Sequence, residues 1–200
     1  MIHIRPLQRA DLPALLHIDA TFTADTTLDV VKTGDGLEVG WRLVERRLEK
    51  PFDRGAEYNL GPQDLADIEG RLARDDTLLL VAEDRQPGAR GRVVALLDLE
   101  AHHWNRTAWL WTLYVDAAYR GRGIGRRLME QAAAWSAGRG LRAIMIETQT
   151  NNTQACRFYA HMGCFLTGIN DTYYSNRDLK RGEVALFWAY PVDRARGGER

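Results

Sequence analysis

The stretch that most restricts the fold of this chain is Ala108–Leu128, where an apolar segment passes through a glycine- and arginine-rich segment into a helical pattern. Ala108–Val115 is apolar, aromatic and β-branched and contains no glycine or proline, which predicts a β-strand. Arg120–Gly125 reads RGRGIG, and from Ile124 onward apolar residues recur at helical spacing. The sequence therefore predicts a strand, a loop and a helix in direct succession.

The first turn of this predicted helix is suited to binding an anion. Its N–H groups have no partner within the helix, and the helix dipole makes that end positive. No Ser, Thr, Asp or Asn caps the helix, whereas glycines let the bare backbone approach a ligand. Arg120, Arg122, Arg126 and Arg127 add positive charge. The expected ligand is a phosphate or pyrophosphate, and the six loop residues alone leave a basic, solvated turn as the alternative.

A second motif follows at Asn152–Tyr159, with the sequence NTQACRFY and with Gly163 after it. Together with Arg120-x-x-Gly123-x-Gly125 behind a strand, this motif resembles the GNAT superfamily of N-acetyltransferases. The loop is neither a P-loop nor a dinucleotide fingerprint, since no Gly-Lys-Ser/Thr follows and no short βα unit opens with G-x-G-x-x-G.

Composition excludes several other classes of protein. The 200 residues suit one domain, expected at 1–192 with a flexible tail at 193–200. Lys+Arg and Asp+Glu both number 27, so the net charge of zero argues against a nucleic-acid binder. No apolar run is long enough for a membrane span and the N-terminus lacks a signal peptide, so a cytoplasmic protein is expected.

The cysteines and histidines give no sign of a metal or a disulfide framework. Cys156 and Cys164 are too few for such a framework, and packing is the expected role of Cys156. His102 and His103 are adjacent, but neither Cys nor carboxylate completes a ligand spacing. We expect no metal.

The remaining patterns predict further strands and helices. Strands are expected at 2–5, 77–83, 93–100, 142–148, 164–169 and 183–190, a hairpin at 27–45, and helices that start near Asp11, Pro62 and Asn152. A Gln-Pro-Gly-Ala-Arg-Gly turn joins the second and third of these strands. The polar stretch 19–26 reads as a connecting loop, and the charged stretch 46–59 as a solvated one.

The resemblance implies an α+β (mixed α/β) fold, with a twisted mixed sheet of about seven strands and about four flanking helices. It also implies that the sheet splays between Ala108–Val115 and Arg142–Thr148, so that the pantetheine arm of acetyl-CoA binds there like an added strand. The implied acetyl-CoA-binding residues are Leu113, Tyr114, Val115, Arg120, Gly121, Arg122, Gly123, Ile124, Gly125, Arg126, Asn152, Ala155 and Tyr159.

The reaction implied is acetyl transfer from acetyl-CoA to an amine. By likeness to the family, Tyr159 is the general acid that protonates the departing thiolate. Many relatives carry a carboxylate base on the strand before the loop, but this chain has Trp111-Thr112 there. Glu147 is the alternative base, because some family members use a glutamate at this spacing from the tyrosine. An exposed strand carboxylate remains the other interpretation of Glu147.

Streptothricin (nourseothricin) acetyltransferases share further segments with this chain. The segments that resemble that group are Thr21–Asp25, Thr33–Gly36, Trp104–Arg106, Glu147–Asn152, Ala155–Tyr159, Tyr174 and Ala185–Trp188. Two departures are Cys164 in place of a phenylalanine and an acid displaced by one position at Asp171. A streptothricin is cationic, so an acidic pocket is expected. Asp19, Asp25, Asp171 and Trp111 are the candidate substrate-binding residues, although each acid alone also fits a solvated loop.

Two other functions stay open at this point. One is acetylation of a protein lysine or N-terminus, which an open groove would favour over an enclosed acidic pocket. The other is a CoA-binding module without turnover, which the missing acid at Trp111-Thr112 would suit. Homodimers are common in the superfamily, and the resemblance allows one here.

Overall fold

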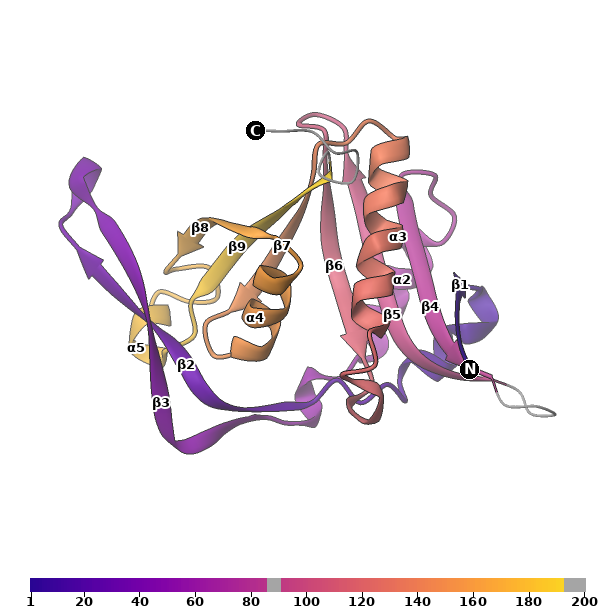
Figure 1. Cartoon of the computed structure of the whole chain (residues 1–200), viewed down its shortest axis with the longest axis horizontal. Coiled ribbons are helices and arrows are strands. Elements are labelled where there is room, and N and C mark those ends of the chain that lie inside the picture. The colour runs from indigo at the N-terminus through magenta and orange to yellow at the C-terminus, as the bar shows by residue number, and fades with distance from the viewer. Residues whose placement is uncertain (86–90, 193–200) are drawn as a thin grey trace. The chain divides into compact units, whose positions relative to one another are not determined.

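A seven-stranded sheet and a two-stranded ribbon form the framework of this computed structural model, which describes residues 1–85 and 91–192 (Figure 1). In sheet order the strands are β1 (Ile2–Pro6), β4 (Thr77–Asp84), β5 (Arg92–His102), β6 (Thr107–Val115), β7 (Ala143–Gln149), β9 (Ala185–Pro191) and β8 (Phe165–Asn170). The ribbon pairs β2 (Phe22–Thr33) with β3 (Gly40–Arg54). The α-helices are α1 (Leu12–Leu15), α2 (Pro62–Arg71), α3 (Ile124–Gly138), α4 (Thr153–His161) and α5 (Asp178–Arg181). The predicted fold class, α+β with a seven-stranded mixed sheet, is confirmed.

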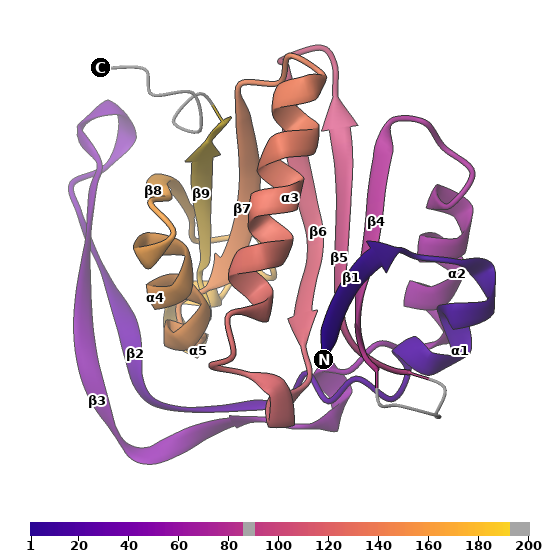
Figure 2. The same cartoon turned by 45° about the vertical axis from the view of Figure 1, so that its right-hand side comes forward.

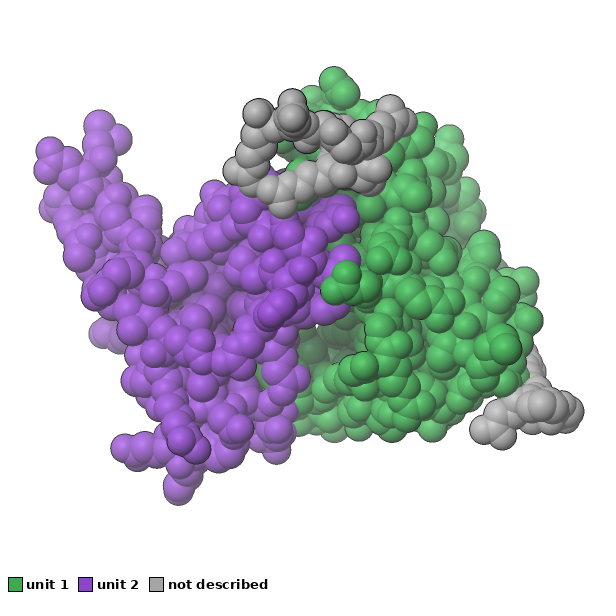
Figure 3. Space-filling model, in the orientation of Figure 1, with its two compact units in different colours: residues 1–22, 54–144, 191–200 green, residues 23–53, 145–190 purple. Residues whose placement is uncertain are grey.

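The chain divides into two compact units (Figure 3). Unit 1 comprises Met1–Phe22, Arg54–Ile144 and Pro191–Arg200, and unit 2 comprises Thr23–Asp53 and Met145–Tyr190. The single domain at 1–192 and the splayed sheet stay predictions. The expected tail at 193–200 and most of the expected turn, residues 86–90, lie outside the described residues.

Unit 1 is built on the antiparallel strands β1, β4, β5 and β6. The apolar runs of β4 and β5 are covered on both faces, which is why these two strands lack a polar alternation. Leu79, Val81 and Leu96 belong to the core cluster that α1 and α2 complete, while α3 contacts the same strands from the opposite face (Figure 2). Leu128 and Met129 on α3 are fully buried. The helix that follows the loop is therefore fixed by its apolar stripe.

Unit 2 carries β8, β9, α4, α5 and most of the ribbon. The hairpin predicted at 27–45 is present, but it is longer at both ends. The loop predicted at 46–59 is wrong for residues 46–54, which belong to β3. Most side chains of β3 are exposed, so the strand shows no apolar alternation and depends on backbone pairing with β2.

Three smaller predictions also need correction. The loop predicted at 19–26 is wrong from Phe22 onward, where β2 begins. The helix expected after Asp11 is a single turn, α1, which follows a 3-10 turn at Arg9–Asp11. Helix α5 lies between the strands expected at 164–169 and 183–190, where its four residues are too few to produce a periodic pattern.

Candidate active site

A β-bulge interrupts β6 ahead of the segment predicted to contact acetyl-CoA. Asp98 of β5 pairs with Thr112, and the next residue, Leu99, pairs with Leu110, so Trp111 has no opposite partner. A bulge bends its strand and interrupts the ladder locally. The bulge therefore changes the direction of the backbone just before Leu113–Val115, the segment predicted to contact acetyl-CoA.

The loop after β6 presents unpaired amides at the start of α3. Gly123 caps the helix with φ of 74° and ψ of 6°, a left-handed conformation that glycine adopts without strain. The first amide bonded back into the helix is that of Arg127, which donates to the Gly123 carbonyl at 3.1 Å. Among residues 1–85 and 91–192, none accepts a hydrogen bond from the amides of Ile124, Gly125 or Arg126. The predicted capless, glycine-led helix start is confirmed.

Substitution of Gly123 tests this conformation. Gly123→Ala should lower the free energy of unfolding by about 1–2 kcal/mol, because an alanine is strained at positive φ. A Cβ at this position meets no atom within 4 Å, so the effect is conformational and not a clash. Gly138→Ala at the other end of α3 is the control, and it should be neutral or stabilising. Equal stability of the two variants in urea unfolding would contradict the strain argument.

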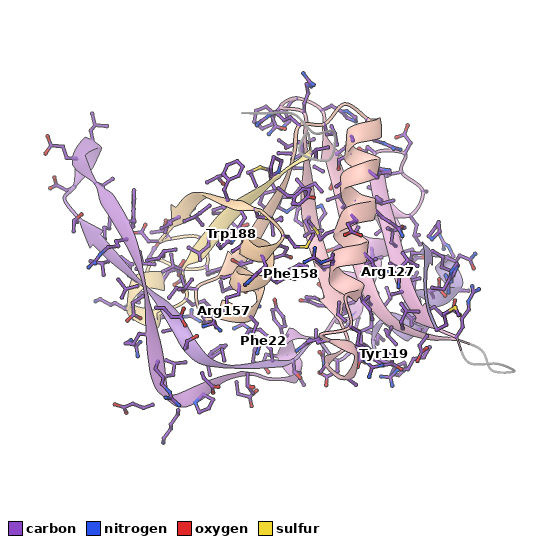
Figure 4. The ribbon with its side chains drawn as sticks, viewed as in Figure 1. Phe22, Tyr119, Arg127, Arg157, Phe158 and Trp188 are labelled. Carbon is purple, nitrogen blue, oxygen red and sulfur yellow. The ribbon has the colours of Figure 1, made fainter. Side chains whose placement is uncertain are left out.

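Three of the four loop arginines hold the backbone of unit 1. Arg120 donates to the carbonyls of Val115 at 3.0 Å, Thr21 at 2.7 Å and Asp19 at 3.3 Å. The Arg122 guanidinium donates to the Ala118 carbonyl, and Arg127 donates to the Ile2 carbonyl. Figure 4 labels Arg127 on α3 and Tyr119, over whose ring the guanidinium of Arg122 lies 4.7 Å from the centroid. These contacts shape the loop around its free amides.

Arg126 differs from those three arginines. Its side chain is exposed, and within the described part of the chain it has no hydrogen-bond or ion-pair partner. It is therefore the arginine of this loop that is available to an incoming phosphate. The sequence predicted that Arg120 and Arg122 also bind the phosphate. Their guanidinium groups, however, already donate to backbone carbonyls.

In unit 2, the second motif forms the start of α4. The side chain of Asn152 accepts a hydrogen bond from the amide of Ala155 at 3.1 Å and caps the helix, as predicted. Tyr159 is buried on this helix, and its ring lies 5.1 Å from that of Phe158, which Figure 4 labels. Cys156 packs in the core beside Thr148, and burial raises the pKa of its thiol. The roles of Asn152, Ala155 and Tyr159 toward a ligand stay predictions.

Glu147 has a partner that sequence reasoning did not identify. It is half-buried on β7, and the hydroxyl of Tyr174 donates a hydrogen bond to its carboxylate. Burial raises the pKa of Glu147 and the bond from Tyr174 opposes the shift, while the nearby charge of Glu183 adds to it. Tyr174 lies 27 positions along the chain in a loop, so no local pattern connects the two residues.

The predicted substrate-binding acids are not gathered in one unit. Asp19 belongs to unit 1, where it accepts hydrogen bonds from the hydroxyl and the amide of Thr21, which lower its pKa. Asp25 is exposed on β2, and Asp171 forms an ion pair with Lys32 at 2.7 Å, both in unit 2.

Trp111 faces a charged group of unit 1. Its indole N–H donates to Glu100 at 2.8 Å, and the guanidinium of Arg71 lies 5.6 Å from its ring centroid.

Among the described residues no group of three or more His, Cys, Asp or Glu side chains is arranged to hold a metal ion. The described part of the chain likewise has no helix long and apolar enough to span a membrane.

The chain matches known proteins along most of its length. Residues 40–164 match the family model described as the acetyltransferase (GNAT) family. A streptothricin acetyltransferase of Streptomyces lavendulae is 29% identical over 189 residues, which cover 94% of this chain and 93% of that protein. One from Escherichia coli is 39% identical over 85 residues, which cover 42% of this chain and 49% of that protein.

Solved structures agree with this likeness. The structure of a nourseothricin acetyltransferase superposes with a TM-score of 0.76 and 27% identity, covering 96% of this chain and 98% of that one. A Bacillus anthracis protein assigned as a streptothricin acetyltransferase, solved in complex with acetyl coenzyme A, gives a TM-score of 0.73 at 22% identity. That match covers 96% of this chain and 99% of the other, and at this identity it shows the fold.

Proposed function

The chain belongs to the GNAT family of N-acetyltransferases, and from this premise we propose that it acetylates an amine of a small cationic molecule, with streptothricin-type antibiotics as the candidate acceptor. The observation that carries the proposal is the 29% identity to a streptothricin acetyltransferase along 94% of the chain. The acetyl donor is acetyl-CoA. This donor is also the compound bound in the Bacillus anthracis structure.

The loop of unit 1 supports the binding of the donor. The free amides of Ile124, Gly125 and Arg126 and the exposed Arg126 guanidinium fit the diphosphate of acetyl-CoA. The backbone of Leu113–Val115 would pair with the pantetheine arm beyond the bulge at Trp111. Arg120 would act through the loop by fixing its carbonyl groups.

The proposed chemistry is a direct transfer. An alkyl ammonium has a pKa of about 10, so a base must take its proton before the nitrogen attacks the thioester carbon. Glu147 is the proposed base. Attack by the amine forms the new C–N bond and a tetrahedral intermediate, which collapses by breaking the C–S bond. Tyr159 gives its phenolic proton to the departing thiolate, and the second proton that the nitrogen loses as it becomes an amide restores the phenol. A backbone N–H near the bulge would stabilise the negative oxygen of the intermediate.

Acidic side chains support a cationic acceptor. Asp25 is exposed on β2, and Asp171 already binds an ammonium group, that of Lys32. An ammonium group of the substrate has the same chemistry as this lysine, so Asp171 is suited to hold it. Trp111 adds an exposed aromatic face of the kind that binds cations.

Mass spectrometry after incubation with acetyl-CoA tests the proposal. Streptothricin, spermidine and a lysine-containing peptide serve as acceptors, and thiol release measures turnover. Streptothricin is expected to gain the mass of one acetyl group at a rate well above that of the peptide. Faster acetylation of the peptide would support a protein acetyltransferase instead. Coenzyme A binding without thiol release from any acceptor would support a binding module without turnover.

A further inference from the structure

The loop between β8 and α5 in unit 2 delivers one side chain to Glu147. The hydroxyl of Tyr174 donates a hydrogen bond to Oε1 of Glu147. The sequence offered Tyr174 only as a point of likeness to other proteins and gave it no role. Glu147 is the proposed base, so the residue that contacts its carboxylate bears on the reaction.

Tyr174 is held in place from both its backbone and its ring. Asp178, which is 1% exposed, accepts hydrogen bonds from the Tyr174 amide at 2.9 Å and from the Ser175 hydroxyl at 2.6 Å. The ring of Tyr174 lies edge-on to that of Tyr173 at 5.1 Å, and Tyr173 lies edge-on to Phe187 of β9 at 5.3 Å. A hydroxyl held this firmly loses little entropy when it binds a carboxylate.

The surroundings of Glu147 favour a donor at this position. Burial and the like charge of Glu183 both raise the pKa of Glu147, while the Tyr174 hydroxyl lowers it by stabilising the ionised form. Burial and the bond to Glu147 raise the pKa of Tyr174, so this phenol stays neutral and donates. The charge of Glu147 in turn helps to raise the pKa of two neighbouring groups, the phenol of Tyr173 and the thiol of Cys156.

We propose that Tyr174 is a positioning residue for Glu147. The Tyr174 hydroxyl holds one carboxylate oxygen of Glu147 and leaves the other oxygen to take the proton of the acceptor amine. The inference rests on the proposed function, because it assigns Glu147 the role of base. A carboxylate with one oxygen fixed in this way has its remaining lone pairs in a defined direction. Tyr174 takes no proton itself and affects the reaction only by positioning Glu147.

The test compares Tyr174→Phe with Tyr173→Phe, a change of the neighbouring ring that leaves the bond to Glu147 in place. Glu147 must be ionised to act as a base, so activity falls on the acidic side of its pKa. Loss of the donor should raise that pKa, and the acidic limb of kcat/KM should move to higher pH by roughly one unit. Tyr173→Phe should leave the limb in place. The KM for acetyl-CoA should be unchanged in both variants.

A second measurement reads the pair without using activity. The carboxyl carbon of Glu147, assigned with a Glu147→Gln variant, should titrate at higher pH in Tyr174→Phe than in the natural chain. Unchanged titration and an unmoved acidic limb in Tyr174→Phe would overturn the inference. If the natural chain acetylates no amine, the proposed function fails and so does the role of Tyr174 in catalysis. The titration of the Glu147 carboxyl carbon needs no turnover, so it still shows whether Tyr174 contacts Glu147 when no amine is acetylated.

Discussion

Tyr159→Phe should lower kcat for acetyl transfer by roughly 10²–10³-fold while the affinity for acetyl-CoA stays nearly unchanged. The variant removes one hydroxyl and keeps the ring, which is buried on α4 against Phe158. Without a proton donor the thiolate of coenzyme A becomes a poor leaving group at neutral pH. The proposed binding site for the diphosphate of acetyl-CoA is the loop of unit 1, whose residues this change leaves untouched.

Calorimetry measures the affinity for acetyl-CoA, and stopped-flow thiol release measures kcat. Tyr190→Phe on β9 is the matched control, because it also removes a single phenolic hydroxyl from unit 2. The control should retain activity within a factor of about two, since no role in the reaction is proposed for it. Full turnover in Tyr159→Phe would remove this residue from the mechanism. Loss of acetyl-CoA affinity with unchanged turnover would instead assign it to binding.

The parts of the fold that the sequence predicts are those whose side chains are buried in a regular pattern. Strands β4, β5 and β6 are continuous apolar runs, and α3 carries an apolar stripe. Gly123 and Asn152 lie at helix starts, where local backbone chemistry fixes the residue type. Each of these signals is contained within a few neighbouring positions, so it can be read without the tertiary structure.

The parts that the sequence does not predict depend on contacts between distant segments. Strand β3 is charged and mostly exposed, so its pairing with β2 decides its structure. Arg120 has the spacing of a phosphate ligand, yet its guanidinium donates to the Thr21 carbonyl 99 positions away. The contact of Glu147 with Tyr174 likewise forms only when the loop after β8 folds back toward β7.

The ion pair between Arg71 and Asp98 in unit 1 should be the most costly polar contact to break. Arg71 donates to the two carboxylate oxygens of Asp98 at 2.6–3.2 Å, and the Asp98 side chain has no exposed surface. Arg71→Met should lower the free energy of unfolding by about 3–5 kcal/mol, because it leaves a buried charge without a partner. For a chain of this length, that loss corresponds to a Tm lower by roughly 10 °C.

Two controls and one pH dependence distinguish this account from a general packing defect. Arg74→Met breaks more exposed ion pairs with Asp76 and Glu100 and should lower the free energy of unfolding far less than Arg71→Met does. The double variant Arg71→Met/Asp98→Leu should recover most of the loss, since it removes both charges.

Burial already raises the pKa of Asp98, and loss of Arg71 raises it further. A carboxyl group whose pKa is higher in the folded than in the unfolded state lowers the free energy of unfolding at neutral pH. This effect disappears at a pH low enough to protonate the group in both states. The deficit of Arg71→Met should therefore shrink as pH falls toward the ordinary range of an aspartate. A deficit that is independent of pH and unrelieved in the double variant would show that lost packing, and not the buried charge, is responsible.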